Sequence, residues 1–143
     1  MKISTKGRYA LQLVLDIAQQ PNHKPVILKD VSKRQSISLK YLEQIMPSLT
    51  SAGLIRSVRG PKGGYYLNKS PEQITVGMIL RLTEGSLAPV DWVDPDIDSK
   101  EQSDAITILV WKKLYKAILD VVDHISIQDL IDQEMAIGGE YYI

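Results

Sequence analysis

The chain has 143 residues, carries 17 Lys and Arg against 17 Asp and Glu, and contains no cysteine. This length is typical of one compact domain, and a hydrophobic share of 44% with 24% charged residues is ordinary for a soluble globular protein. The absence of cysteine excludes disulfides, thiolate nucleophiles and cysteine-ligated zinc or iron–sulfur centres. No apolar run approaches the roughly 18 residues of a membrane-spanning helix and no cleavable leader is recognisable, so we expect a cytoplasmic protein without a membrane partner.

The net charge of zero conceals an uneven distribution along the chain. Residues 1–70 carry 12 Lys and Arg against 3 Asp and Glu, a net charge of +9, whereas residues 71–143 carry 5 against 14, a net charge of −9. A basic half joined to an acidic half indicates that only the first half faces a polyanion. The alternative is a chance clustering of charges on two solvated surfaces.

Three helices are expected in the basic half, at residues 4–18, 28–34 and 38–52. Ser4 or Thr5 can cap the first helix and Ser38 the third, because a hydroxyl there accepts from free backbone N–H groups of the first turn. Gly53 is expected to end the third helix. Pro47 lies inside that helix, so a kink or an irregular turn is expected in its second half.

A basic hairpin is expected to follow the third helix. From Leu54 the apolar period changes from helical to two, and Tyr65-Tyr66-Leu67 can return as a second strand. The intervening residues 60–64, rich in glycine and containing Lys62, favour a tight turn between the two strands.

The acidic half is expected to contain helices on both sides of a loop. Pro71 is expected to open a helix that Gly85 closes, and residues 86–104, with two prolines and six acids, are expected to form a surface loop. The longest periodic segment, residues 105–122, predicts a long helix. Residues 126–129 have the pattern of a capping box and predict a last, short helix.

Two short helices with a tight turn between them, followed by a basic hairpin, are typical of a winged helix-turn-helix. The second helix is narrow enough to lie in the major groove of DNA, while cations of the hairpin reach phosphates or the minor groove. The alternative, a helical hairpin packed on a small sheet with a solvated charged face, is disfavoured by the excess of positive charge in the same segment. The expected fold is therefore mainly α with a small β-hairpin.

Several motifs, in a fixed order, also carry a resemblance to a known family. They are Lys6-Gly7-Arg8-Tyr9, Tyr41-Leu42-Glu43-Gln44, Ala52-Gly53-Leu54, Ser57-Val58-Arg59-Gly60, Gly63-Gly64-Tyr65, Leu82-Thr83-Glu84-Gly85 and Ala88-Pro89-Val90. With them the chain resembles, over almost its whole length, the bacterial Rrf-type family of winged helix-turn-helix regulators, which includes IscR, NsrR and CymR. The resemblance implies a homodimeric, sequence-specific DNA-binding regulator in which the long helix near the carboxyl end crosses to the second copy. A two-fold symmetric dimer is expected to read a palindromic operator in double-stranded DNA.

This interpretation assigns roles to residues and segments. We expect DNA contacts from the first helix, the 38–52 helix and the hairpin, at Lys6, Tyr9, Ser38, Lys40, Tyr41, Glu43, Gln44, Arg59 and Lys62. We expect dimer contacts along one face of the long helix, at Val110, Leu114, Ala117, Ile118 and Val121. The expected division is a winged helix-turn-helix DNA-binding domain (1–85), an acidic loop that is the candidate sensing segment (86–104), and a dimerisation helix with a C-terminal tail (105–143).

One departure from the family pattern bears on cofactors. In the cluster-binding members, three cysteines of the segment corresponding to residues 86–104 hold an iron–sulfur centre, whereas this segment offers Trp92, Asp98, Ser99, Ser103 and Asp104. The closer resemblance is to the cluster-free CymR-type branch, which regulates sulfur and cysteine metabolism, and we expect no cofactor. That branch also lacks the cysteines and shares the opening Met1-Lys2-Ile3-Ser4-Thr5-Lys6-Gly7-Arg8-Tyr9 and an aromatic-rich end like Tyr141-Tyr142-Ile143. In that branch the signal can come from a protein partner such as cysteine synthase; a small-molecule effector is the alternative.

Metal-binding, catalytic and packing roles can also be considered for single residues. Asp94, Asp96 and Asp98 alternate as in a calcium loop, but the required Gly and Glu are missing from the sixth and twelfth positions. Neither histidine has a nucleophile and a third group beside it, so we expect no enzyme. Trp92 can cover the dimer seam or line a pocket. The main alternative for the whole chain is a winged-helix protein-interaction module without DNA binding; in a DNA-binding regulator, repression is favoured over activation.

Overall fold

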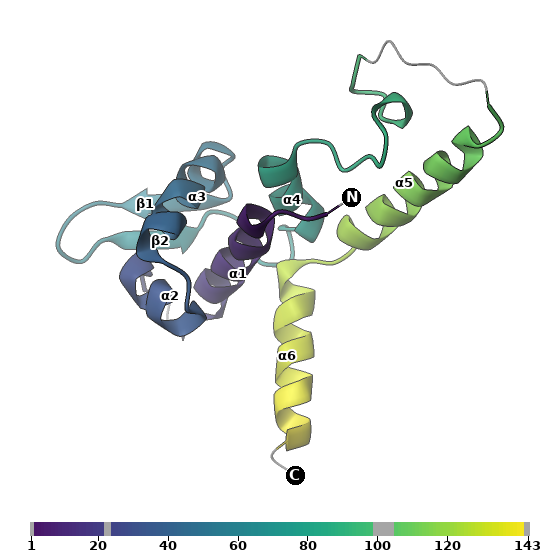
Figure 1. Cartoon of the computed structure of the whole chain (residues 1–143). Coiled ribbons are helices and arrows are strands. Elements are labelled where there is room, and N and C mark those ends of the chain that lie inside the picture. Colours follow the sequence, from purple (N-terminus) through teal and green to yellow (C-terminus); the bar gives the residue numbers. More distant parts are fainter. Residues whose placement is uncertain (1, 22–23, 99–104, 142–143) are drawn as a thin grey trace.

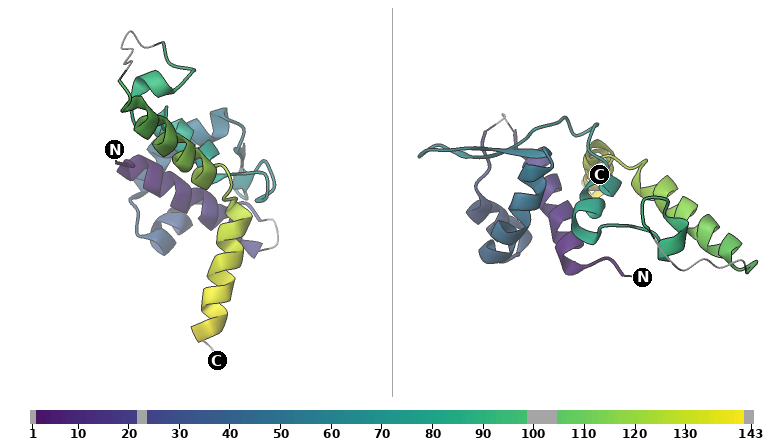
Figure 2. Two further views of the ribbon diagram at one scale, coloured as in Figure 1. Left: turned by 90° about the vertical axis from the view of Figure 1, so that its right-hand side faces the viewer. Right: turned by 90° about the horizontal axis from the view of Figure 1, so that it is seen from above.

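The computed structural model describes residues 2–21, 24–98 and 105–141 of the chain (Figure 1). The elements, in chain order, are α1 (Thr5–Gln19), α2 (Leu28–Gln35), α3 (Leu39–Ser51), β1 (Ile55–Val58), β2 (Gly64–Leu67), α4 (Val76–Glu84), the 3-10 turn η2 (Asp91–Val93), α5 (Ile108–Val122) and α6 (Ile127–Tyr141). Helices α1 to α4 and the hairpin form one body, from which α5 and α6 project in different directions (Figures 1 and 2). The predicted fold class, mainly α with a small hairpin, is confirmed.

Helices α1 and α3 begin where the sequence predicts. The Ser4 hydroxyl accepts from the Gly7 N–H at 3.0 Å, and the Ser38 hydroxyl accepts from the Tyr41 N–H at 3.1 Å. Each hydroxyl satisfies a backbone donor that has no partner inside the helix, which fixes the first turn. Both caps bear on function, because the amino-terminal turns of α1 and α3 carry predicted DNA contacts.

Helix α3 differs from the prediction at its proline. The irregular turn, one of the two expected outcomes, is wrong, since α3 continues as a helix through Pro47 to Ser51; the kink stays a prediction. Its end is as predicted: Gly53, with φ of 76°, donates to the Thr50 carbonyl, and Leu54 N–H donates to the Leu49 carbonyl. This pair of bonds is a Schellman motif, and its left-handed residue is best supplied by glycine.

The hairpin is a two-stranded antiparallel sheet that pairs Ile55 with Leu67 and Arg56 with Tyr66. Val26, from the segment before α2, exchanges two backbone hydrogen bonds of 2.9 Å with Tyr65 and so adds a short bridge to the β2 edge. The hairpin is thereby tied to the helical body at its base, while its tip extends away from it (Figure 1).

The acidic half is built differently from the prediction in several places. Helix α4 begins at Val76 and not at Pro71, because the Thr75 hydroxyl caps it and residues 71–73 form a turn. Helix α5 begins at Ile108, three residues later than predicted. Helix α6 opens at the predicted capping box, with Asp129 N–H donating to the Ser126 hydroxyl, but with 15 residues it is not short.

The sequence predicted a surface loop after α4, but the described part of this loop, residues 86–98, is partly structured and partly buried. It contains η2, buries Leu87, and holds the Asp94 side chain at 7% exposure. The Asp94 carboxylate accepts hydrogen bonds from the Ser86 hydroxyl and from the Asp96 N–H. Residues 99–104 of the predicted acidic loop lie outside the described residues, as does the end of the predicted tail, residues 142–143.

The main hydrophobic core lies between α1, α2, α3, one side of α4, the base of the hairpin and the first turn of α6. Its fully buried members include Leu13, Leu42, Ile45, Ile55 and Ile127. A smaller cluster of Val76, Leu80 and Leu87 packs against α5. No residue of α5 is itself buried, so this helix contributes little to the core of a single chain.

Candidate nucleic-acid interface

Helix α3 presents a polar face beside its capped amino terminus. Lys40, Glu43 and Gln44 are exposed, while Leu42 and Ile45 on the opposite face are buried in the core. Residues three and four apart share one side of a helix, so these polar side chains form a continuous surface. A helix that buries one face and offers donors and acceptors on the other can enter the major groove and contact base edges.

The two predicted tyrosine contacts have a packing role as well. The rings of Tyr9 on α1 and Tyr41 on α3 meet edge to face, with centroids 5.2 Å apart and planes at 80°, and both residues are half-buried. The Arg8 guanidinium lies 5.9 Å from the Tyr9 ring centroid. Aromatic pairs of this geometry stabilise helix packing, so these tyrosines hold α1 against α3 as well as lying close to the exposed face.

The hairpin carries the predicted cations at its tip. Arg59 and Lys62 are both exposed, and Gly63 N–H donates to the Gly60 carbonyl at 2.9 Å to close the turn between them. The tip projects beyond the helical body on the same side as α3 (Figure 1). The arrangement leaves both charged side chains free to reach a phosphate backbone or a minor groove next to α3.

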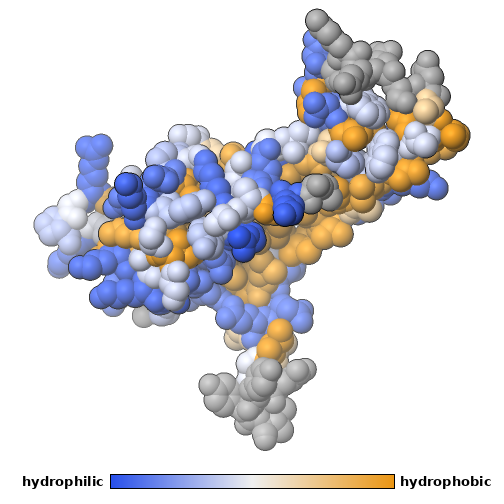
Figure 3. Space-filling view, viewed as in Figure 1, coloured by the Kyte–Doolittle hydropathy of each residue, from blue (hydrophilic) through white to orange (hydrophobic). Residues whose placement is uncertain are grey.

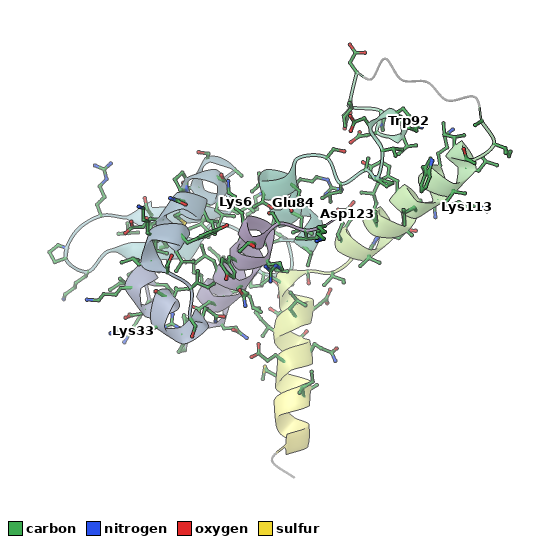
Figure 4. All side chains as sticks on the ribbon, viewed as in Figure 1. Lys6, Lys33, Glu84, Trp92, Lys113 and Asp123 are labelled. Atoms are coloured by element: carbon green, nitrogen blue, oxygen red, sulfur yellow. The ribbon has the colours of Figure 1, made fainter. Side chains whose placement is uncertain are left out.

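Lys6 lies apart from the α3 face, at the junction of α1 with α4 (Figure 4). Glu84, at the end of α4, accepts hydrogen bonds from the Ser4 backbone N–H and from its hydroxyl, the latter at 2.7 Å. Burial raises the pKa of the Glu84 carboxyl, but the hydrogen bonds from Ser4 and Thr83 and the charge of Lys6 outweigh it, so this pKa lies below its ordinary value. Lys6 therefore has the Glu84 carboxylate as a neighbour within the junction of α1 and α4.

A buried ion pair that the sequence analysis did not identify joins α1 to α2. The Asp16 carboxylate, on the core side of α1, accepts from Arg34 at 2.7 and 3.0 Å and from the Gln35 amide at 2.9 Å. The hydrogen bonds that Arg34 donates to Asp16 raise the pKa of the guanidinium. The pair fixes the end of α2, from which the turn leads directly into α3. The signal was present in the sequence, because Asp16 is a carboxylate in phase with the apolar residues Leu13 and Ile17.

The predicted dimer residues lie on the exposed surface of α5, with one exception. Val110 and Val121 are more than half exposed, at 55% and 56%, and Leu114 is 38% exposed. Ala117 is exposed too, whereas Ile118 is half-buried against the smaller hydrophobic cluster of Val76, Leu80 and Leu87. The space-filling view shows an apolar band over α5 that continues toward the body (Figure 3). A helix with this much uncovered apolar side chain is expected to have a partner surface.

Helix α5 is attached to α4 through an ion pair. Arg81 donates two hydrogen bonds to Asp123, at 2.7 and 2.8 Å, which raise the pKa of Arg81 and lower that of Asp123. Gly77 makes room for this pair, since a Cβ there would lie 2.1 Å from an Asp123 carboxylate oxygen. The loop is held against α5 in a similar way. The Ser86 hydroxyl, the Asp96 N–H and the Tyr115 hydroxyl of α5 donate hydrogen bonds to the Asp94 carboxylate, and these bonds lower the pKa of Asp94. The loop, α4 and α5 are therefore connected by polar contacts.

The loop after α4 offers no thiolate ligand for a metal or an iron–sulfur cluster. The chain has no cysteine, and among residues 2–21, 24–98 and 105–141 no group of three His, Asp or Glu side chains could hold a metal ion. Asp94 is occupied by its protein partners, and Trp92, whose ring N–H is buried without a hydrogen-bond partner in the described structure, is not a metal ligand. His23, Ser99, Ser103 and Asp104 lie outside the described residues.

Within the described part of the chain, no helix has the length and apolar character to cross a bilayer.

Comparisons with known proteins agree with this architecture. The CymR regulator of Bacillus subtilis is 36% identical over 130 residues, covering 91% of this chain and 89% of that protein. The IscR regulator of Aliivibrio salmonicida is 39% identical over 136 residues, covering 94% and 80%. The solved structure of CymR, described as the global cysteine regulator of B. subtilis, superposes with a TM-score of 0.79 at 34% identity, covering 93% of this chain and 98% of that one.

A family model agrees as well. The model named Rrf2 and described as "Iron-dependent Transcriptional regulator" matches residues 3–133. The match spans every element from α1 to α5 and the first half of α6, and the relatives carry the name of transcriptional regulators, not of enzymes. The chain belongs to the Rrf2 family of helix-turn-helix transcriptional regulators.

Proposed function

We propose that this regulator acts as a homodimeric repressor that binds a palindromic operator in double-stranded DNA. The observation that carries the proposal is the exposed polar face of α3 beside a hairpin tip with two free cations, in a half of the chain with a net charge of +9. In this arrangement Lys40 and Lys62 contact phosphates, Glu43 and Gln44 read base edges, and Arg59 enters the minor groove. Repression is proposed over activation because a dimer whose operator overlaps a promoter excludes the polymerase.

The proposed roles follow the division expected from the sequence. Residues 1–85 bind DNA, the loop at residues 86–104 senses a signal, and residues 105–143 join two copies. The contacts of Asp94 and the Arg81–Asp123 pair support a path from the loop to the DNA-binding helices. An effector, whether a small molecule or a protein such as cysteine synthase, must bind one dimer geometry better than another to change operator affinity.

We also propose that this member works without an iron–sulfur cluster. The family model is described as iron-dependent, but the donor set of this chain does not fit such a group, because carboxylates and hydroxyls suit hard cations and a cluster needs thiolates. The similarity to the B. subtilis regulator described as a cysteine regulator supports a role in sulfur metabolism.

Anaerobic purification from iron-replete cells tests the absence of a cluster. We expect colourless protein, without the visible absorption of iron–sulfur charge transfer and without stoichiometric iron or sulfide, that still binds its operator. Brown protein with stoichiometric iron and sulfide would overturn this part of the proposal.

Salt dependence tests the proposed DNA binding. Each phosphate neutralised by a cation contributes about −0.9 to the slope of log K against log salt, so Lys62→Ala should flatten the slope by roughly two in a symmetric dimer. Affinity should fall alike on operator and on random duplex. Lys113→Ala, which removes an exposed lysine of α5 (Figure 4), should leave the slope unchanged. A slope near zero in the unmodified protein would favour the protein-interaction module instead.

Glu43 tests the proposed reading of bases by α3. A carboxylate in the major groove accepts a hydrogen bond from a cytosine amino group, and one such contact contributes about 1–3 kcal/mol of discrimination. Glu43→Ala should therefore relax the preference at one base position per half-site when the variant selects from a randomised pool. Glu72→Ala, which removes an equally exposed carboxylate outside α3, should select the original sequence. Identical selections by both variants would leave Glu43 as a solvated charge.

A further inference from the structure

A groove of about 570 Å³ lies at the root of the hairpin. It opens beside the bridge between Val26 and Tyr65, and both Tyr65 and Lys24 line it. Its walls come from the last turn of α1, from both strands, and from the turn that follows β2. This volume lies within the range of pockets that bind small molecules.

The groove is basic and has an apolar floor. Lys24, Arg56 and Lys69 line it, no Asp or Glu does, and none of these cations forms a salt bridge with a described residue. Ile17 and Leu67 are among the apolar lining residues. Convergent cations without a carboxylate to neutralise them leave a positive potential inside a concave surface, which attracts an anion.

The groove is separate from the proposed DNA contacts. None of its lining residues comes from α3 or from the hairpin tip at residues 59–63. A DNA backbone is convex and gains nothing from an apolar floor, whereas a small molecule with a hydrocarbon or aromatic body buries that body there. The shape therefore favours a small ligand over a phosphate of the duplex.

We propose that this groove is a binding site for a small organic anion, one that carries a carboxylate or phosphate on an apolar or aromatic body. Lys24, Arg56 and Lys69 hold the anionic group, and Tyr66 with the apolar floor covers the body of the ligand.

Such a ligand acts on the hairpin. The Arg56 guanidinium lies 4.6 Å from the centroid of the Tyr66 ring, its cross-strand partner, so a ligand that draws Arg56 toward its own charge changes this stacking in the stem of the hairpin. The site thereby couples to the tip that carries Arg59 and Lys62. This regulatory consequence rests on the proposed DNA binding, and by reciprocity DNA must alter ligand affinity by the same factor; the existence of the site does not rest on it.

Pyridoxal 5′-phosphate is a suitable probe because it combines an aromatic ring, a phosphate and an aldehyde. Its aldehyde condenses with a lysine amine and releases water, and borohydride then reduces the C=N bond to a stable amine that peptide mass spectrometry locates. At substoichiometric probe, we expect Lys24 and Lys69 of the full chain to be labelled about tenfold more than Lys33 and Lys113, which are also exposed but lie outside the groove. Labelling spread evenly over the exposed lysines would overturn the proposal.

Arg56→Ala should lower the labelling of Lys24 and Lys69 by about tenfold, since it removes a charged partner of the phosphate. Lys33→Ala is the matched control and should leave the labelling of both lysines unchanged. If Arg56→Ala does not fold by circular dichroism, Lys69→Gln takes its place, with loss of Lys24 labelling as the expected result. Unchanged labelling of Lys24 in a folded variant would contradict the proposed site.

Excess random duplex DNA separates the proposed site from the DNA interface. We expect the duplex to protect Lys62 while Lys24 and Lys69 are still labelled. Equal protection of all three lysines would place the groove in the DNA interface and overturn the small-ligand proposal. A protein that shows selective labelling without any protection of Lys62 would retain the site and lose the proposed DNA binding, so the two failures are distinguishable.

Discussion

Arg34→Ala is expected to lower the free energy of unfolding by about 3 kcal/mol, the lower end of the range for breaking one side of a buried ion pair. The reason is asymmetric exposure: the Arg34 side chain is 39% exposed, whereas that of Asp16 is only 2% exposed. Removal of Arg34 leaves a buried carboxylate with only amide partners, while removal of Asp16 leaves a cation that can turn toward water. Urea denaturation followed by circular dichroism measures the difference.

A double variant sharpens this test. Asp16→Asn added to Arg34→Ala should recover part of the lost stability, because no buried charge then remains unpaired. Arg81→Ala is the matched control: it breaks another bidentate pair with aspartate, but one whose members are 41% and 34% exposed, so its expected cost is about 1 kcal/mol or less. If Arg34→Ala cost no more than Arg81→Ala, the pair between α1 and α2 would have no special role.

The same variant is expected to weaken operator binding beyond its effect on folding. The Asp16–Arg34 pair holds the end of α2, and the turn that follows, with Ser36 in the left-handed conformation, leads into the cap of α3 at Ser38. A loosened α2 therefore misplaces the exposed face of α3 relative to the hairpin tip. Affinity measured at a temperature where the variant is fully folded separates this effect from unfolding.

The elements that the sequence predicted correctly are those governed by local chemistry. The caps at Ser4 and Ser38, the glycine end of α3 and the period-two strands depend on residues within a few positions of each other. Tertiary contacts decided the rest. The segment before α4 forms no helix because Thr75 pairs with Ser126 in a β-bridge and Ile74 accepts from the Ile127 N–H. Neither partner is visible in the local pattern.

The candidate site shows the same division between local and tertiary information. Exposure of Lys40, Glu43 and Gln44 follows from the periodicity of one helix, and the structure bears it out. Burial of Asp16 could have been inferred from its phase in α1, but its partner Arg34 lies in another helix and no spacing rule connects them. The groove at the root of the hairpin is assembled from segments far apart in the chain, so no motif predicted it.

The pair of substitutions Val110→Glu and Leu114→Glu is expected to convert a dimer into monomers. The face of α5 formed by Val110, Leu114 and Val121 recurs at helical spacing over about 16 Å. The described residues of the single chain leave these three side chains exposed, so they do not explain its apolar character. A symmetric contact between two copies brings the introduced carboxylates close to each other, which raises the dimer dissociation constant by about 100-fold or more. Ile118, also predicted at this interface, is a poorer choice for the test because it packs against the cluster of α4.

Sedimentation equilibrium and operator titration measure the two consequences together. The double variant should sediment as a folded monomer and lose the tight binding to a palindrome, because each half-site alone supplies only half of the contacts. Lys113→Glu changes the net charge of α5 by the same amount as the double variant but replaces a side chain that is already polar and exposed, so it should remain a dimer with unchanged operator affinity. An unmodified protein that sediments as a monomer and binds its operator fully would show that the apolar face of α5 serves another partner.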